Sequence, residues 1–196
     1  MRKAILKTER NTNILLSLKK LDYLTRSQLQ VLHNLGGERN AQKVLKELSP
    51  YVECFRDGEN VYYLNAAGRS IVGGKPRAKT LQARHFIMRN SLYIAFGQPE
   101  TWKSETRLKV NKQVSVVADA IFYDEEGTLN IVEVDHTQTM AKNAKKLEKY
   151  TKLLELGVFK SSPRFIWITM TEYRRKKIKE LSAGMHSHVF TAAEFN

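Results

Sequence analysis

Three acidic side chains lie inside apolar stretches in the second half of the chain. Asp119 falls within Val116–Phe122, and Glu133 and Asp135 fall within Ile131–Asp135. A carboxylate in an apolar strand is costly unless it is paired, hydrogen-bonded or bound to a metal ion. These positions are therefore the first candidates for chemistry.

The spacing of these residues predicts how they meet. The loop at 124–127 indicates a hairpin, and if Tyr123 pairs with Leu129, Asp119 lies directly opposite Glu133. Asp135 shares the face of Glu133 because side chains alternate along a strand. Opposed carboxylates repel each other, and a Mg²⁺ or Mn²⁺ ion would relieve that repulsion. The expected metal ligands are Asp119, Glu133, Glu105 and Asp135.

A lysine is also needed if these carboxylates belong to a nuclease, because negative charge develops during phosphodiester cleavage. The helix expected at 139–156 carries Lys142, Lys146 and Lys149 along one stripe. A solvated face, or a phosphate-gripping surface without chemistry, is the alternative for this stripe. Tyr150 shares a stripe with leucines and is expected in the core. The residues that would be catalytic in a nuclease are Asp119, Glu133, Asp135, Lys146 and Lys149.

The elements around these residues predict an α/β domain. We expect a helix at 81–96, strands at 102–110, 114–123 and 128–136, the helix at 139–156, a strand at 164–170, a helix capped by Thr171 and a last short strand with Val189 and Phe190. The strand–helix–strand order makes 128–136 and 164–170 parallel neighbours. The second half is thus expected to be a mixed sheet flanked by helices.

The first half has the order of a winged helix-turn-helix. An apolar stripe over 13–24 predicts a helix, and Thr25 with Gln28 forms a capping box for a short second helix that ends at Gly36-Gly37. Asn40 is expected to cap a third helix, and a hairpin is expected around Asp57-Gly58. This half is therefore α+β, and its third helix is the expected recognition helix.

Side chains suited to base edges and phosphates lie on the outward face of the third helix, near the start of the second and on the wing. The expected DNA-binding residues are Arg26, Gln28, Arg39, Asn40, Gln42, Lys43, Lys46 and Arg56. The alternative is a small helical module that binds proteins, since winged helices also do so. Charge favours DNA, because the chain carries 33 Lys+Arg and 20 Asp+Glu, a net charge of +13.

Domain organisation and location follow from composition. Gly73–Arg77 is the best linker, which predicts a first domain at 1–78 with the element order of a winged helix-turn-helix and a second domain at 79–196 with the mixed sheet. Cys54 is the only cysteine, so an intramolecular disulfide and a cysteine-based zinc site are excluded. No long apolar run or signal peptide is seen, so we expect a cytoplasmic protein with no membrane partner.

Several motifs resemble known families. Val61–Arg69 resembles the second wing strand and following helix of bacterial winged-helix regulators. Asp119 followed by Glu133-Val134-Asp135 and a helix resembles the PD-(D/E)XK restriction-endonuclease-like superfamily. The superfamily pattern is broken twice, because Ala118 replaces the motif proline and Asp135 stands where its lysine is expected.

The chain from about residue 12 to 170 resembles the replication-relaxation family of Gram-positive plasmids and mobile elements. The shared features are Leu24–Leu29, Arg39-Asn40-Ala41, Trp102 with Glu105, Asp119-Ala120, Glu133-Val134-Asp135 and Lys146–Tyr150. The resemblance implies a context of plasmid replication and of relaxation during conjugation.

Two functions remain open from the sequence. The first is a protein that binds double-stranded DNA in plasmid or mobile-element replication, relaxation or transcriptional control, with a nuclease-like domain that lacks a full active site. The second is a Mg²⁺-dependent endonuclease or nickase that its winged helix delivers to DNA. Reading of two half-sites would favour a homodimer, and the family context implies replication or relaxosome proteins as further partners.

Overall fold

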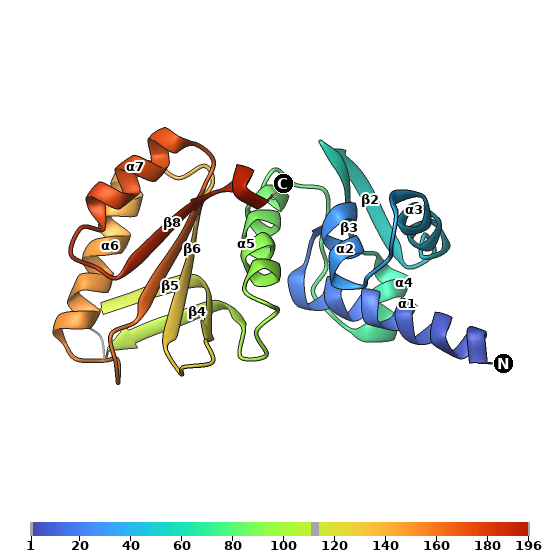
Figure 1. Cartoon of the computed structure of the whole chain (residues 1–196), viewed down its shortest axis with the longest axis horizontal. Helices are drawn as coiled ribbons and strands as arrows, with labels where there is room; N and C mark the ends of the chain where they lie inside the picture. Colours follow the sequence, from blue (N-terminus) through green and yellow to red (C-terminus); the bar gives the residue numbers. More distant parts are fainter. Residues whose placement is uncertain (1, 111–113, 196) are drawn as a thin grey trace. The chain divides into compact units, whose positions relative to one another are not determined.

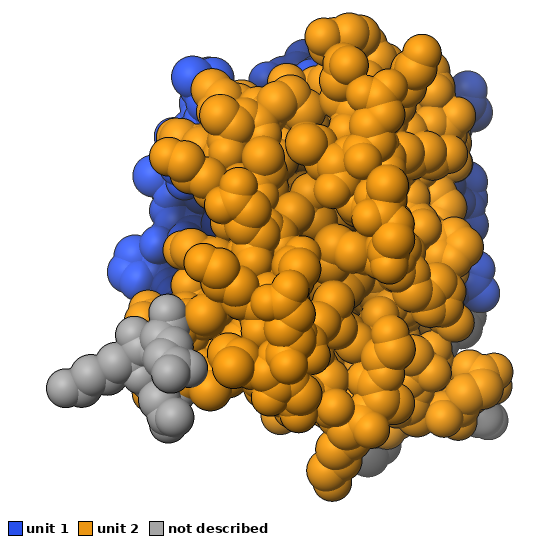
Figure 2. All heavy atoms as spheres, turned by 90° about the vertical axis from the view of Figure 1, so that its left-hand side faces the viewer, with its two compact units in different colours: residues 1–90 blue, residues 91–196 orange. Residues whose placement is uncertain are grey.

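The computed structural model describes residues 2–110 and 114–195. The chain divides into two compact units, Met1–Asn90 and Ser91–Asn196 (Figures 1 and 2). Both units combine helices with a sheet, and each is described by itself below.

Unit 1 combines a small antiparallel sheet with several helices, the longest of which has 20 residues. Its elements, in chain order, are α1 (Arg2–Leu21), β1 (Leu24–Thr25), α2 (Arg26–Leu32), α3 (Glu38–Glu47), β2 (Val52–Asp57), β3 (Glu59–Leu64) and α4 (Ala66–Val72). The strand order is β1-β3-β2 (Figure 1). The β2–β3 hairpin turns at Gly58, whose φ of 74° suits a glycine. The predicted hairpin is therefore confirmed.

Local sequence explains where the helices of unit 1 begin. The side chain of Thr25 accepts a hydrogen bond from the backbone N–H of Gln28, and the Gln28 side chain accepts one from the N–H of Thr25, which confirms the predicted capping box. The predicted cap of α3 is wrong, because α3 begins after Gly37. Asn40 lies inside α3, and its amide donates to the Leu35 carbonyl across 2.7 Å. This side chain closes the turn between α2 and α3.

The unit boundary lies inside α5 (Ala83–Ala95) rather than near residue 78. The first half of α5 belongs to unit 1 because its polar side chains bond the α1–β1 turn. The buried amide of Asn90 donates to the carbonyls of Leu21 and Tyr23 at 2.9 and 2.7 Å. Arg89 is 1% exposed and lies 3.6 Å from the carboxylate of Asp22. Composition predicted the linker at Gly73–Arg77, but these contacts decide the boundary.

Unit 2 contains a five-stranded mixed sheet in the order β4-β5-β6-β7-β8. The elements are β4 (Lys103–Val110), β5 (Val114–Tyr123), β6 (Leu129–Asp135), α6 (Met140–Glu155), β7 (Arg164–Thr169), α7 (Glu172–Leu181), β8 (Ser187–Thr191) and the short helix η1 (Ala192–Phe195). The pairs β4–β5 and β5–β6 are antiparallel, whereas β6–β7 and β7–β8 are parallel. The predicted mixed sheet with a crossover from 128–136 to 164–170 is confirmed.

Helices α6 and α7 cover one face of this sheet (Figure 1). The core on that side includes Ile131, Leu147, Tyr150 and Leu153. Phe122 alternates with Ile121 and so faces the other side, where its ring lies 5.5 Å from that of Trp102. Strand β6 is buried along its whole length, so any carboxylate on it is withdrawn from water.

Candidate functional site

Glu133 lies in the middle of β6 and faces α6. Its carboxylate is 1% exposed, and it accepts hydrogen bonds from the ammonium of Lys146 and the hydroxyl of Tyr150, both on α6. Lys146 and Tyr150 are four residues apart, so the helix presents them on one face. Lys146, a member of the predicted lysine stripe of α6, therefore contacts Glu133 directly.

Burial raises the pKa of Glu133 well above its usual value, and the nearby charge of Asp119 raises it further. Lys146 and Tyr150 act in the opposite direction without reversing the shift. The pKa of Tyr150 is also raised, because its hydroxyl is buried and faces Glu133. The cluster therefore favours a proton on the carboxyl of Glu133.

Asp119 comes directly before Ala120, the first β5 residue that pairs with β6, and continuation of that register leads to Glu133. The predicted register is confirmed, since Tyr123 pairs with Leu129 and Ala120 with Val132. The carboxylate of Asp119 accepts the backbone N–H of Val134 across 2.7 Å, so a side chain takes the place of a ladder bond here. A charged acceptor makes such a bond strong. Asp119 is thereby fixed beside Glu133.

Glu105 lies on β4 between two residues that pair with β5. Ser104 pairs with Ala120 and Thr106 with Ala118, which places Glu105 opposite Asp119. Its φ is 50°, in the left-handed region that a glutamate rarely adopts within a strand. Three of the four predicted metal ligands therefore occupy neighbouring positions on adjacent strands.

Asp135 is held differently from the other carboxylates. Its oxygens accept hydrogen bonds from Asn143 at 2.7 Å, Thr169 at 2.8 Å and Arg174 at 2.7 and 2.5 Å. The side chain is fully buried, and the bonds from Arg174, Asn143 and Thr169 lower its pKa despite burial. We therefore assign Asp135 to joining β6, α6, β7 and α7, rather than to metal binding or catalysis.

The fit of these residues to a divalent cation is incomplete. Both oxygens of Glu133 are used by Lys146 and Tyr150, and one oxygen of Asp119 is used by Val134. Among the residues that the structure describes, no three His, Cys, Asp or Glu side chains gather as a metal site would require. The described arrangement is therefore a carboxyl cluster in which Lys146 and Tyr150 hydrogen-bond Glu133, and no metal-dependent step follows from it.

A groove runs between β5 and α6 beside this cluster. Its volume is about 380 Å³, and Lys146 is one of the residues that line it. The lining residues, which we call the α6 groove, are Ser115, Val116, Val117, Gln138, Lys142, Lys145, Lys146 and Lys149. Lys149 therefore lines the groove, whereas the hydrogen bonds described for Glu133 come from Lys146 and Tyr150.

In unit 1, the predicted DNA-binding residues divide into exposed and engaged ones. The side chains of Arg39, Lys43 and Lys46 are exposed on α3, and Arg56 is exposed on β2. Gln42 is exposed too, and its amide donates to Glu38 at 3.1 Å. These positions match a helix face that is free to approach a ligand.

Gln28 does not belong to that face. It is 8% exposed, and its amide donates to the Ile87 carbonyl at 2.9 Å in addition to the capping bond. Because the Gln28 side chain is bonded to the backbone N–H of Thr25 and to the Ile87 carbonyl, it points away from the exposed face of α3. The structure therefore assigns the Gln28 side chain to contacts within unit 1, and its DNA-binding role stays a prediction.

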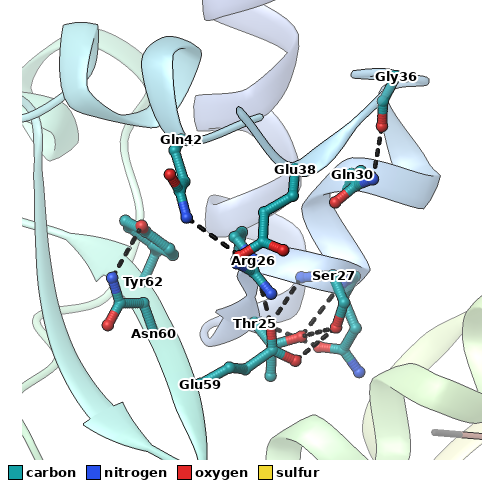
Figure 3. A network of polar contacts seen from close by, with 11 residues as sticks. Thr25, Arg26, Ser27, Gln30, Gly36, Glu38, Gln42, Glu59, Asn60 and Tyr62 are labelled. Carbon is teal, nitrogen blue, oxygen red and sulfur yellow. Dashed lines mark hydrogen bonds and ion pairs between the residues drawn. The ribbon is translucent and has the colours of Figure 1, made fainter. Parts of the chain in front are cut away.

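Arg26 lies at the centre of a polar network that joins α2, α3 and β3 (Figure 3). Its guanidinium forms an ion pair with Glu38 and lies 3.7 Å from Glu59. Glu59 also accepts the backbone N–H of Ser27 at 2.9 Å, together with the Ser27 hydroxyl. The network fixes α3 and the hairpin relative to α2, so Arg26 is a positioning residue.

A second groove lies between α3 and the β2–β3 hairpin. It has a volume of about 530 Å³, and Lys46 and Arg56 line it together with Arg26, Glu38 and Glu59. The network of Figure 3 forms one part of its wall. Sequence reasoning missed the two glutamates, since nothing in their spacing shows that Arg26 reaches both.

The sequence matches the replication-relaxation family over residues 15–166. The chain belongs to the replication-relaxation family. The match covers most of both units of this replication-relaxation protein, and the resemblance inferred from its motifs is confirmed.

Comparison with curated proteins gives no match. Among solved structures, this replication-relaxation protein is similar to protein VC1899 from Vibrio cholerae, with a TM-score of 0.43 and 12% identity. The alignment covers 95% of this chain and 53% of that one, so the chain spans about half of its length. Within the described residues, no helix is long and apolar enough to cross a membrane.

Proposed function

We propose that this protein binds duplex DNA through α3 and acts in the replication or relaxation of a plasmid or mobile element. The observation that carries the proposal is the exposed face of α3, where Arg39, Gln42, Lys43 and Lys46 lie together. Family membership supplies the context of replication and relaxation. Transcriptional control is a further role that such binding would support.

The arrangement of unit 1 supports a winged helix-turn-helix. The α2–turn–α3 pair is followed directly by the β2–β3 hairpin, which is the element order of that motif. In this assignment α3 enters the major groove, where arginine and glutamine side chains hydrogen-bond base edges. Arg56 on the hairpin then contacts the backbone or an adjacent minor groove.

The Arg26 network supports the same assignment. A recognition helix has to be held rigidly, because base-edge hydrogen bonds require fixed geometry. The ion pairs of Arg26 with Glu38 and Glu59 tie the start of α3 and the hairpin to α2. Removal of Arg26 should therefore weaken selectivity by loosening α3, without loss of a base contact.

The test of α3 uses the whole chain and a pool of random duplexes. Duplexes that wild-type protein enriches are compared with scrambled duplexes by fluorescence anisotropy. We expect Arg39→Ala with Lys43→Ala to weaken binding to the enriched duplex at least about tenfold and to reduce its preference over the scrambled one. The control, Lys176→Ala with Lys179→Ala, removes the same charge from exposed positions of α7.

An unchanged preference in the α3 variant would contradict the placement of the recognition helix. Absence of any enriched duplex with wild-type protein would contradict sequence selectivity itself. Circular dichroism of each variant checks that the fold is retained.

We propose further that the carboxylate cluster of unit 2 is a nuclease-like arrangement without a full active site. Support comes from Lys146 and Tyr150, which occupy both oxygens of Glu133, and from Asp135, which Arg174 engages. The second candidate, a Mg²⁺- or Mn²⁺-dependent endonuclease or nickase, is favoured by the position of Asp119 and Glu133 on neighbouring strands beside Lys146.

A cleavage assay on supercoiled plasmid distinguishes the incomplete site from the endonuclease. We expect the plasmid to remain supercoiled with wild-type protein in the presence of Mg²⁺ or Mn²⁺. The endonuclease would instead be established if wild-type protein nicks the plasmid, Glu133→Gln abolishes this nicking, and the exposed control Glu126→Gln retains it.

A further inference from the structure

We propose that the α6 groove of unit 2 is a second binding site for the phosphate backbone of duplex DNA, separate from α3. The groove brings four lysines of α6 beside one face of β5. This inference concerns a different unit from the proposed recognition helix, and it stands or falls independently of α3.

Most of the positive charge of the groove lacks an acidic partner among the described residues. In the part of the chain that the structure describes, Lys142, Lys145 and Lys149 have no ion-pair partner, whereas Lys146 pairs with Glu133. Like charges three and four residues apart on a helix repel each other. A polyanion along the groove would relieve this repulsion.

The position of Lys142 at the start of α6 further favours a bound anion. It is the third residue of α6, counted from Met140, and the first turn contains no acidic residue. The amino end of a helix carries partial positive charge, so a lysine there is unfavourable and a bound anion is favourable. The amino end of α6 and the α6 lysines therefore both favour a bound anion.

The groove combines a fixed cation with adjustable ones. Lys146 is 17% exposed and is held by the buried carboxylate of Glu133, so its ammonium has a defined place in the groove wall. Lys142, Lys145 and Lys149 are exposed, and their side chains can follow the spacing of successive phosphates. Such an arrangement suits a regularly charged backbone better than a single small anion.

The lining favours duplex over single-stranded DNA. Single strands are bound through stacking of their bases on aromatic side chains, in addition to phosphate contacts. Among the described residues that line the α6 groove, none is aromatic. Lysines, a glutamine, a serine and two valines contact a backbone but provide no stacking platform, so the expected ligand keeps its bases paired.

The experiment uses full-length chain and a random-sequence duplex. The groove variant carries Lys142→Ala, Lys145→Ala and Lys149→Ala, and it leaves Lys146 in place because Glu133 is buried against it. The matched control carries Lys160→Ala, Lys176→Ala and Lys179→Ala, which removes the same charge from exposed positions outside the groove. Both sets are made in wild-type chain and in the Arg39→Ala, Lys43→Ala background.

We expect the groove variant to bind the duplex at least about tenfold more weakly than the control. The slope of log affinity against log salt should become shallower by about 2–3, because about 0.9 counterions are released per phosphate contact. The same loss should appear in the α3-variant background, which separates this site from the proposed recognition helix.

Equal affinity and equal salt slope in the groove variant and the control would overturn the proposal. A groove-dependent preference for single-stranded over duplex DNA would overturn the duplex assignment. Thermal unfolding of the variants shows whether a loss reflects the groove or the fold, and Lys145→Arg with Lys149→Arg should retain binding if charge is what matters.

Discussion

The pH dependence of stability should report on Glu133. Because its folded-state pKa is raised above the usual value of 4.5, the folded chain keeps a proton that the unfolded chain releases as the pH rises. The free energy of unfolding therefore falls with pH above that value, by up to about 1.4 kcal/mol per pH unit. Glu133→Gln should remove this component, so the variant gains stability relative to wild type as the pH rises.

Urea unfolding at a series of pH values measures this difference. Glu126→Gln changes an exposed glutamate and should follow the wild-type pH dependence. A stability difference between Glu133→Gln and wild type that is constant with pH would show that Lys146 keeps the carboxylate ionised in the folded chain.

The ion pair of the buried Asp135 with the partly buried Arg174 should contribute to the stability of unit 2. Removal of one partner from a buried pair leaves a charge without compensation and typically costs about 3–5 kcal/mol. Arg174→Ala should therefore lower the free energy of unfolding by about this amount. Lys176→Ala, an exposed change on the same helix, should have little effect. A loss below about 1 kcal/mol for Arg174→Ala would show that the hydrogen bonds from Asn143 and Thr169 are enough to stabilise the buried Asp135 carboxylate.

Residue types alone could not separate the roles of Glu133 and Asp135. Both carboxylates lie on one face of β6, as alternation along a strand predicts, and both resemble metal ligands in the sequence. Their partners differ because Lys146 and Tyr150 reach one, while Arg174, which is 39 positions away in the sequence, reaches the other. Only the packing of α6 and α7 on the sheet reveals this.

At the scale of elements, α4 depends on a glycine that the sequence does not single out. A Cβ added to Gly68 would lie 2.1 Å from the Tyr51 carbonyl oxygen, which is backbone and cannot move aside easily. Gly68→Ala should force α4 away from the start of β2 and cost about 3 kcal/mol. The exposed change Ser70→Ala, on the same helix, serves as control in chemical unfolding. Equal stability of the two variants would contradict this packing.

Much of the element order could be predicted from sequence. Thr25 and Thr171 cap helices as predicted, and the Asp57-Gly58 pair marks the hairpin turn. Local hydrogen bonds decide these features, so short stretches of sequence suffice. Asn40 shows the limit, because an asparagine that looks like a cap instead bonds a carbonyl five residues earlier.

At the scale of the whole molecule, the charge of +13 predicts steep salt dependence. Binding to a random duplex should weaken more than tenfold between about 50 and 200 mM salt, as counterions released from DNA become more concentrated. Anisotropy titrations at several salt concentrations measure the slope. A flat response would indicate that the basic surfaces are not the ones in contact with DNA.

The position of α5 decides how the protein can be divided for experiments. A fragment that stops at residue 78, after the glycine-rich segment, would remove Arg89 and Asn90 and leave the Leu21 and Tyr23 carbonyls without these donors. It would also uncover Tyr23, which packs against Phe86 with ring centroids 5.3 Å apart. A fragment of unit 1 that extends through the end of α5 keeps these contacts, so proteolysis should spare this longer fragment and degrade the shorter one.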